Sequence, residues 1–363
     1  MQGEVDNINK VVTSESKESV LDSIKSWKIV IPIVIGIGVT IWMLLSEYEP
    51  GSFNVIKFSA STLLWFFVAM IMMATRDVGY MMRIRILSDK DLSWRQSFRI
   101  IMLWEFASAV TPSAVGGTSV AVFFVNREGI HIGRATGIVM VTSFLDELFF
   151  ALVFPLVVFT IGYVNVFGLD EGLAAGFARL AWIGYSVKLA YIILLSYGLF
   201  VNPHGFKWLL EKIFSLPYIN RWRDKISSVG DDIITTSINF QNWPFKRWVK
   251  AFVATSASWI ARYWVANALI VAFFGITQLS LFDHFIVFGK QLAMWIMMLV
   301  APTPGGAGFA EYIFKEFLSA FIPLGTGVAL ALAWRMVSYY PYLIIGAILV
   351  PKWVSKIKVK RGK

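Results

Sequence analysis

The chain alternates between long apolar runs and short polar segments. Six of the runs are long enough for a helix to cross about 30 Å of hydrocarbon. We predict membrane-spanning helices over residues 29–45, 58–75, 135–161, 180–201, 248–274 and 328–350. These runs are continuous, whereas the strands of membrane β-barrels are short and alternate between apolar and polar residues. The pattern therefore predicts an all-α polytopic membrane protein with about six spanning helices.

Two further apolar segments are interrupted by proline and glycine. The later interruption contains Pro302, Thr303, Pro304, Gly305, Gly306 and Gly308, and the earlier one contains Thr111, Pro112, Gly116 and Gly117. Proline lacks a backbone N–H and glycine favours turns, so neither segment continues as one helix. Interrupted backbone at membrane depth is tolerated where protein buries it or where it lines a water-filled cavity. We therefore predict two re-entrant broken-helix hairpins.

Composition and charge narrow the class of protein. The chain is 57% hydrophobic and 15% charged, with a mean hydropathy of +0.66, whereas a soluble domain is about one quarter charged. The net charge of +10 comes largely from loops beside apolar runs, which indicates contact with anionic lipid rather than nucleic acid. There is no cysteine, and the three histidines lack metal-ligand spacing. No phosphate-binding loop or catalytic triad occurs. We expect no metal, no cofactor and no catalytic residue.

The basic segments predict the orientation. Lysine and arginine are enriched in cytoplasmic loops. One such loop is assigned to Arg76, Arg83, Arg85, Lys90, Arg95 and Arg99, and others lie near residues 126–134 and 202–247. The predicted organisation is a polar cytoplasmic tail over 1–27, a transmembrane region over 28–350 and a basic cytoplasmic tail over 351–363, in the cell inner (plasma) membrane. The loop 202–247 mixes aromatic and basic residues, which suits amphipathic helices on the inner leaflet or a linker packed on the protein.

The two broken units form an inverted repeat in this topology. They cover residues 98–161 and 285–350, and in each a long span with an internal charge follows the turn. Gly117 precedes Asp146 by 29 residues, and Gly306 precedes Arg335 by the same number. The first unit enters from the cytoplasm and the second from outside. Inverted repeats with broken helices are typical of transporters whose binding site lies at the membrane midplane.

Ionisable residues at membrane depth mark the candidate site, because they cost about 2.5–3.5 kcal/mol each on insertion scales. The predicted substrate-binding residues are Asp146, Glu147, Arg262, Glu311, Arg335 and Tyr339. The arginines suit a phosphate or carboxylate, the acids suit a cationic group or a proton, and Tyr339 can donate a hydrogen bond. Alternatively, Asp146 and Arg335 form a structural ion pair. Glu105 and Lys290 are expected nearer an interface, and Lys188 is a further cavity candidate.

The residues of both turns resemble a known family. Thr111-Pro112-x-x-x-Gly116-Gly117, the run from Pro302 through Gly308 to Glu311, and Arg335 with a tyrosine one turn later resemble the lysylphosphatidylglycerol synthase transmembrane family. This is the flippase-like membrane region of the multiple peptide resistance factor and its stand-alone relatives. The resemblance covers about residues 28–350. Many relatives carry an arginine where this chain has Ser143, and no soluble synthase region follows here, so we expect no synthesis of aminoacyl lipid by this chain.

The resemblance implies a lipid flippase or transporter. It would move a phospholipid, which can be aminoacylated or glycosylated, or a related polyprenyl lipid, between leaflets through a charged midplane cavity. A membrane-embedded transferase acting on a lipid-linked polyprenyl substrate, with Asp146 or Glu311 as base, is the alternative. A scaffold for a partner enzyme is the third reading. The expected partners are membrane phospholipid, anionic inner-leaflet lipid at the basic loops and a separate lipid-modifying enzyme.

Overall fold

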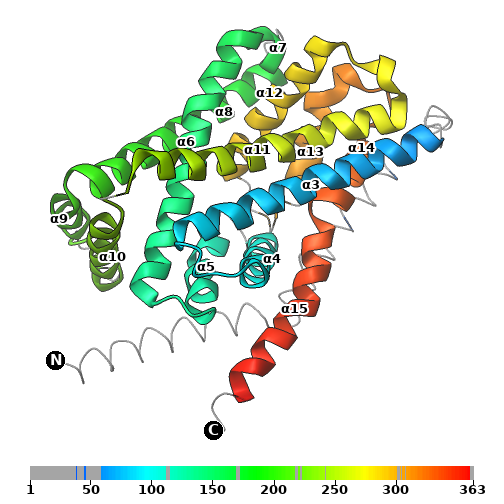
Figure 1. Ribbon diagram of the computed structural model, residues 1–363. Coiled ribbons are helices and arrows are strands. Elements are labelled where there is room, and N and C mark those ends of the chain that lie inside the picture. The colour runs from blue at the N-terminus through cyan, green and yellow to red at the C-terminus, as the bar shows by residue number, and fades with distance from the viewer. Residues whose placement is uncertain are drawn as a thin grey trace, which may run out of the picture.

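The computed structural model describes residues 38, 45, 59–111, 115–168, 172–216, 220, 223–241, 243–300, 303, 305, 306 and 308–359. This part of the chain consists of helices and connecting turns, and it contains no strand (Figure 1). The principal helices are α3 (Ala60–Leu87), α4 (Trp94–Val110), α5 (Val115–Arg127), α6 (Ile132–Ile161), α7 (Tyr163–Phe167), α8 (Leu173–Ser196), α9 (Pro203–Ile213), α10 (Arg223–Gln241), α11 (Phe245–Phe274), α12 (Leu281–Met297), α13 (Phe309–Leu318), α14 (Gly327–Ser338) and α15 (Tyr340–Val359). Short helical turns are η2 (Tyr197–Val201), η4 (Ile276–Gln278), η5 (Met298–Val300) and η6 (Ser319–Phe321).

The described residues contain five helical segments that are long and apolar enough to cross a membrane. They are Ala60–Leu87, Ile132–Ile161, Ala175–Val201, Phe245–Phe274 and Gly327–Pro351. Five of the six predicted spans are therefore confirmed, and the first, 29–45, lies outside the described residues apart from Gly38 and Leu45. Large apolar side chains on these helices are exposed, for example Phe67, Phe159 and Ile193. Such a surface is stable against lipid, and the protein is an all-α polytopic membrane protein.

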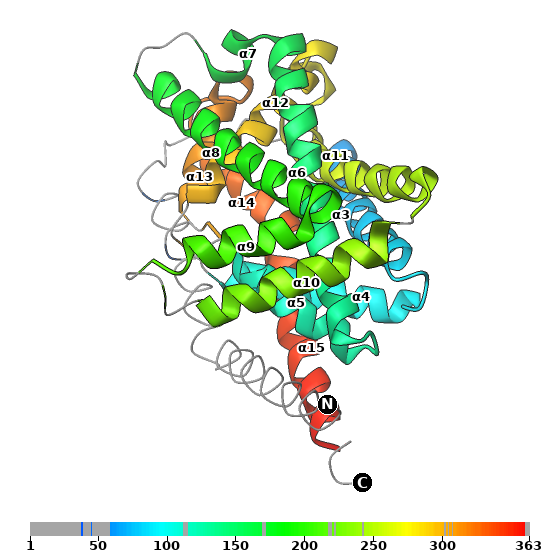
Figure 2. The same cartoon turned by 90° about the vertical axis from the view of Figure 1, so that its left-hand side faces the viewer.

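Helix α3 extends well beyond its predicted end at residue 75. Arg76, Arg83 and Arg85, assigned above to a basic loop, lie within this helix, and Arg76 and Arg83 are buried. Arg95 and Arg99 lie within α4, so the assignment of these five residues to a loop is wrong. Arg76, Tyr80 and Arg83 follow a spacing of four and then three, which places them on one face of a helix. That face is turned inward, and α3 packs along its length against α11 (Figures 1 and 2).

Both interrupted segments fold back as helical hairpins. Helices α4 and α5 form the first, and α12 and α13 form the second. A glutamine joins the two ends of each hairpin at its base: Gln96 donates to the Glu128 carbonyl at 2.8 Å, and Gln278 donates to the Phe321 carbonyl at 3.0 Å. Each segment therefore returns to the end from which it started.

The first interruption is shorter than predicted. Helix α5 begins at Val115, so Gly116 and Gly117 belong to its first turn and not to a loop. A Cβ at Gly117 would lie 1.9 Å from the Ser108 hydroxyl oxygen. Glycine is therefore needed here for the close approach of α4 and α5. Pro112 lies outside the described residues, as do Pro302 and Pro304 of the second turn.

The two hairpins point in opposite directions. Helix α6 starts at the base of the first hairpin and, with 30 residues, runs for about 45 Å. Its far end leads into α7, which packs against α12 of the second hairpin; Lys290 donates to the Val166 carbonyl at 3.1 Å. Both views show α7 and α12 at one end of the molecule and α4 and α5 toward the other (Figures 1 and 2). The two bases thus lie at opposite ends of α6, as an inverted repeat requires.

The last predicted span, 328–350, is interrupted at Tyr339. Helix α14 ends at Ser338 and α15 begins at Tyr340, with Tyr339 at φ −132° and ψ −58° between them. Pro341 lacks a backbone N–H, and its ring clashes with the carbonyl four residues earlier, which disrupts a continuous helix. Tyr339 therefore lies outside regular helix, and its side chain is buried.

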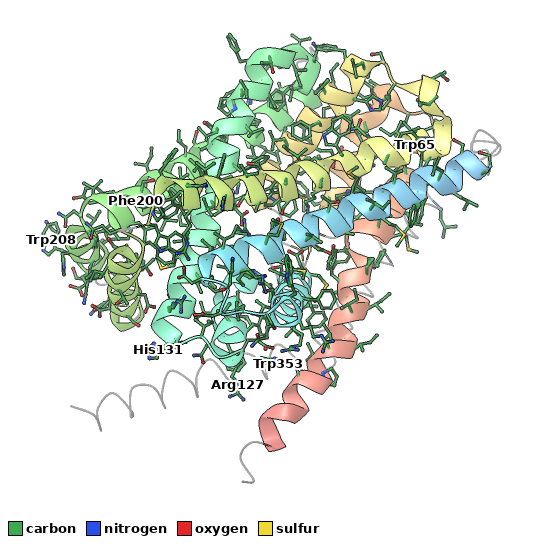
Figure 3. All side chains as sticks on the ribbon, viewed as in Figure 1. Trp65, Arg127, His131, Phe200, Trp208 and Trp353 are labelled. Carbon is green, nitrogen blue, oxygen red and sulfur yellow. The ribbon has the colours of Figure 1, made fainter. Side chains whose placement is uncertain are left out.

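The predicted loop 202–247 contains two helices, α9 and α10, which pack on each other. Helix α10 also packs on α6, so this region is attached to the protein. At the same time, Trp208, Ile213 and Leu216 are exposed. Trp208 and the nearby Phe200 lie at the edge of the molecule (Figure 3).

Candidate functional site

A cavity of about 260 Å³ lies where the two hairpin turns meet. Thr111 lines it from the first turn, and Thr303, Gly305 and Gly306 line it from the second. The charged side chains that line it are Arg76, Arg83, Glu105, Asp146, Lys188, Arg262 and Arg335. They come from six helices, α3, α4, α6, α8, α11 and α14, so the fold gathers charges from the whole length of the chain.

Most of the predicted site residues face this cavity. Asp146, Arg262, Arg335 and Tyr339 line it directly. Glu147 and Glu311 are not among the lining residues; each pairs with a basic residue that is. Their predicted roles in binding a substrate remain predictions.

Arg335 and Glu311 form a buried ion pair in the second unit. Nε of Arg335 donates to Glu311 Oε1 at 2.7 Å, and Nη2 donates to Oε2 at 3.3 Å. The side chains are 6% and 3% exposed, so the pair is almost fully removed from solvent. Glu311 also accepts the backbone N–H of Gly308 at 2.7 Å, which caps the start of α13. The helix start is therefore occupied by the protein's own carboxylate.

Tyr339 joins the two hairpin turns. Its hydroxyl donates to the Ala109 carbonyl at the end of α4, at 3.0 Å. Its ring lies against Gly305, where a Cβ would come within 2.4 Å of a ring carbon. Gly305 also has φ +57°, in the left-handed region that favours glycine, and its carbonyl accepts from Arg335 at 3.1 Å.

Asp146 pairs with Arg83 in the first unit. The guanidinium of Arg83 contacts both carboxylate oxygens, at 2.5 and 3.2 Å, and donates to the Thr255 hydroxyl at 3.1 Å. The indole N–H of Trp259 donates to Asp146 Oδ1 at 2.7 Å. The alternative of an Asp146–Arg335 ion pair is therefore wrong, because each residue is held by another partner.

Arg76 holds two carboxylates at once. Its Nη1 donates to Asp77 at 2.9 Å, and its Nη2 lies 2.5 Å from Glu105. The guanidinium lies over the rings of Tyr80 and Tyr342, at 4.7 and 5.0 Å from the centroids. The Tyr342 hydroxyl is within 3.0 Å of both Asp77 oxygens. The expectation of an interfacial Glu105 is wrong, because this residue lines the cavity.

The two lysines differ in position. Lys188 lines the cavity and donates to both oxygens of Glu147, at 2.8 and 3.0 Å. It also lies 4.7 Å from the centroid of the Phe150 ring. Lys290, on α12, is absent from the lining of the cavity and donates instead to the Val166 carbonyl of α7.

Arg262 differs from the other cations of the cavity in its contacts. Its guanidinium lies over the Trp295 ring at 4.3 Å and over the Trp259 ring at 5.8 Å. Within the described part of the chain it has no carboxylate partner, whereas Arg76, Arg83, Lys188 and Arg335 each have one. Aromatic faces stabilise a guanidinium and leave its N–H groups available to a ligand.

The cavity wall carries more positive than negative charge. Five basic residues line it, against the carboxylates of Glu105 and Asp146. Three further acids, Asp77, Glu147 and Glu311, do not line the cavity. Each forms an ion pair with a basic residue that does. Such a surface favours an anionic group, and the planar fork of arginine matches phosphate or carboxylate oxygens.

Arg76 and Arg83 were not predicted as site residues, because the second span was predicted to end at residue 75 and both residues were assigned to a loop. The signal was present in the helical spacing of Arg76, Tyr80 and Arg83. The role of Trp259, whose hydrogen bond to Asp146 spans 113 positions in the chain, was not predicted either.

Comparison with known proteins places the chain in a family. The family described as "Lysylphosphatidylglycerol synthase TM region" matches residues 29–346. A "UPF0104 membrane protein" of Archaeoglobus fulgidus is 24% identical over 346 residues, which cover 92% of this chain and 99% of that protein. No solved structure matches. This chain, a multi-pass membrane protein, therefore belongs to the lysylphosphatidylglycerol synthase transmembrane-region family.

Proposed function

We propose that this protein moves an anionic phospholipid between the leaflets of the cell membrane and that the lipid phosphate binds at Arg262. The observation that carries the proposal is an arginine in a net-positive cavity wall that forms no ion pair with a carboxylate in the described part of the chain. An arginine at membrane depth without a direct ion pair is costly, so it is retained where a ligand supplies that contact.

The size of the cavity supports a headgroup as the ligand. Its volume of about 260 Å³ is just below the range of about 300–1,000 Å³ that is usual for small-molecule sites. A phosphate with a small polar substituent suits this space, while the acyl chains of the lipid would remain outside. The hydroxyls of Ser143 and Thr118, which line the cavity, are available to an aminoacyl or glycosyl substituent.

The architecture supports transport. Two broken-helix hairpins of opposite direction meet at the cavity, which is the arrangement found where a substrate is exposed alternately to the two sides of a membrane. The basic segments support an inner (plasma) membrane location with both termini in the cytoplasm and with anionic lipid near α9 and α10. A separate lipid-modifying enzyme would supply an aminoacylated or glycosylated substrate.

The geometry gives less support to a transferase. The two carboxylates considered as bases are both engaged: Asp146 by Arg83 and Trp259, and Glu311 by Arg335 and the Gly308 N–H. A general base must be within reach of a substrate proton, and each oxygen of both carboxylates already accepts a hydrogen bond from the protein.

The test is lipid translocation in vesicles of phosphatidylcholine and phosphatidylglycerol that carry a fluorescent phosphatidylglycerol. A membrane-impermeant reductant quenches the probe in the outer leaflet, and the rate of further quenching reports translocation. We expect Arg262→Gln to slow translocation at least tenfold and Arg262→Lys to be intermediate, because lysine keeps the charge without the planar fork.

The matched control is Lys290→Gln, which removes another half-buried cation that is absent from the cavity lining. It should translocate lipid at the wild-type rate. Equal rates for Arg262→Gln and wild type would refute the phosphate site, and a wild-type protein without translocation for any phospholipid would refute the transporter.

A further inference from the structure

The Arg76 cluster contains one carboxylate more than it has cations. We define this cluster as Arg76, Asp77, Glu105 and Tyr342. Arg76 is 1% exposed and contacts both acids, so one guanidinium serves two carboxylates in a space largely removed from water. Its Nε is buried and has no hydrogen-bond partner among the described residues, so no further acid is paired there.

The charges around the cavity balance only when Arg262 is counted. The basic members are Arg76, Arg83, Lys188, Arg262 and Arg335, and the acidic members are Asp77, Glu105, Asp146, Glu147 and Glu311. Three of the basic residues have one acid each. The extra acid of the Arg76 cluster is therefore offset by Arg262, which faces the same cavity as Glu105.

An anion at Arg262 would upset this balance. A phosphodiester brings one negative charge, and the described network would then hold one negative charge in excess in a poorly solvated space. Buried charges without compensation are strongly disfavoured, and a protein group in that situation tends to take up or release a proton. Protonation of one of the two acids that share Arg76 would restore the neutrality of the network.

We propose that Asp77 takes up one proton when an anionic headgroup binds in the cavity, so that each lipid is moved together with a proton. This inference rests on the function proposed above and adds its energy source. In the step, a proton from solvent forms an O–H bond with a carboxylate oxygen of Asp77, and the neutral acid releases the same proton when the lipid leaves.

The contacts of Asp77 favour it over Glu105 as the proton site. Asp77 is not among the residues that line the cavity, whereas Glu105 is, so Glu105 remains the counter-charge that faces Arg262. The Tyr342 hydroxyl lies at 3.0 and 2.9 Å from the two Asp77 oxygens. A hydroxyl donates to an ionised carboxylate and can rotate to accept from a protonated one, so it supports both states.

The groups that face this cluster come from every helix packed on α3. Glu105 comes from α4, Tyr342 from α15, and Tyr80 from α3 itself. From α11, the Ser258 hydroxyl donates to the Arg76 carbonyl at 3.0 Å, and Arg262 faces the same cavity. Asp146 of α6 and Arg335 of α14 are held by Arg83 and Glu311.

The experiment measures translocation of fluorescent phosphatidylglycerol in the same vesicles over a series of pH values equal on both sides. We expect the wild-type rate to fall as pH rises, approaching tenfold per pH unit for one proton per lipid. Asp77→Asn mimics the protonated acid and should lose this dependence. Tyr342→Phe, which removes a donor to the ionised carboxylate, should shift the profile toward higher pH.

The control is Asp232→Asn on α10. Burial and the neighbouring Asp231 raise the pKa of Asp232 to about 6, yet this residue is absent from the cavity lining. It should leave the pH profile of translocation unchanged. The proposal is overturned if translocation by the wild type does not depend on pH, if Asp77→Asn keeps the dependence, or if Glu105→Gln removes it while Asp77→Asn does not. In all three outcomes the lipid transporter itself would stand, whereas no wild-type translocation at any pH would overturn both.

Discussion

The two hairpin units share a fold and differ in how their central charge is held. In the second unit, Arg335 pairs with Glu311, only 24 positions away and within the same unit. In the first unit, Asp146 pairs with Arg83 of α3, which lies outside the repeat. The charge at the equivalent position has the opposite sign in the two units, so the same backbone supports either sign as long as a partner is supplied.

The turns of the two units also use glycine differently. Gly305 is needed for its left-handed backbone and for contact with Tyr339, whereas Gly117 is helical and is needed for the close packing of α4 on α5. The repeat in the sequence therefore marks two related hairpins whose tips are built by different means. The second unit is the more self-contained, and the first depends on helices from elsewhere in the chain.

The largest expected effect is on the buried pair of the second unit. Glu311→Gln should lower the free energy of unfolding by about 3–5 kcal/mol, because it leaves a buried guanidinium without its partner. Asp146→Asn should cost less, since the Asp146 side chain is 22% exposed and water can replace part of the interaction. Unfolding in detergent, followed by circular dichroism, measures both.

The comparison would fail if the two variants were equally destabilised. A double variant in which Met replaces Arg335 and Leu replaces Glu311 is the control for charge. It should recover much of the stability lost by Glu311→Gln, because no charge is then left buried and unpaired.

The glycines of the two turns should respond differently to alanine. Gly305→Ala is expected to cost about 1–2 kcal/mol for the left-handed backbone and about 1–3 kcal/mol for the clash with Tyr339. Gly117→Ala should cost about 1–3 kcal/mol from crowding alone. Adding Ser108→Ala removes the hydroxyl nearest to Gly117 and should relieve part of that cost. Thermal unfolding of the single and double variants checks this, and a stable Gly305→Ala protein would contradict the assignment.

The hydrogen bond of Tyr339 that joins the two turns should contribute less to the free energy of unfolding. Tyr339→Phe removes the hydrogen bond to the Ala109 carbonyl and should cost about 0.5–1.5 kcal/mol. Tyr163→Phe on α7 is the matched control, because this tyrosine is 46% exposed. A shift in the unfolding midpoint for Tyr339→Phe alone supports a direct bond between the tips, and equal shifts for both would argue against it.

The smallest expected effect on stability concerns the packing of α10 on α6 of the first unit. The pKa of Asp232 is raised, by burial first and by Asp231 second, to about 6 from an ordinary 3.8. The folded state therefore holds this proton more tightly than the unfolded state, and stability is lost as pH rises through about 6. Because the group is partly exposed, we expect about 1 kcal/mol or less. Asp232→Asn should remove that part of the pH dependence, as measured by unfolding midpoints at pH values below and above 6.

Much of the fold was predictable because it depends on local chemistry. Apolar runs of sufficient length predicted five spans that the structure confirms, and proline with glycine predicted both hairpins. The end of α3 was predicted at residue 75, which is too early. Arg76 and Arg83 were assigned to a loop because only their charge was considered. The interruption at Tyr339 was missed although Pro341 was visible, since a proline in a membrane helix does not by itself show where the chain departs from helical geometry.

The candidate site was predictable in part. Ionisable residues within apolar runs are rare and costly, and this singled out Asp146, Arg262 and Arg335, all of which line the cavity. The partners of these charges were not predictable. Arg83 is 63 positions from Asp146, and the Trp259 N–H that completes the contact is 113 positions away.

The sequence by itself determined that the protein is helical, that it belongs in a membrane, and that its two halves each contain an interrupted helix, because these follow from hydropathy and from backbone chemistry within a few residues. Only the tertiary structure decided which charges form direct ion pairs and which keeps its N–H groups for a ligand. Pairing depends on how helices distant in the chain rotate and pack against one another. Arg262 and Arg335 are both arginines within apolar runs, and only the packed fold shows that one has a carboxylate partner while the other, within the described residues, does not.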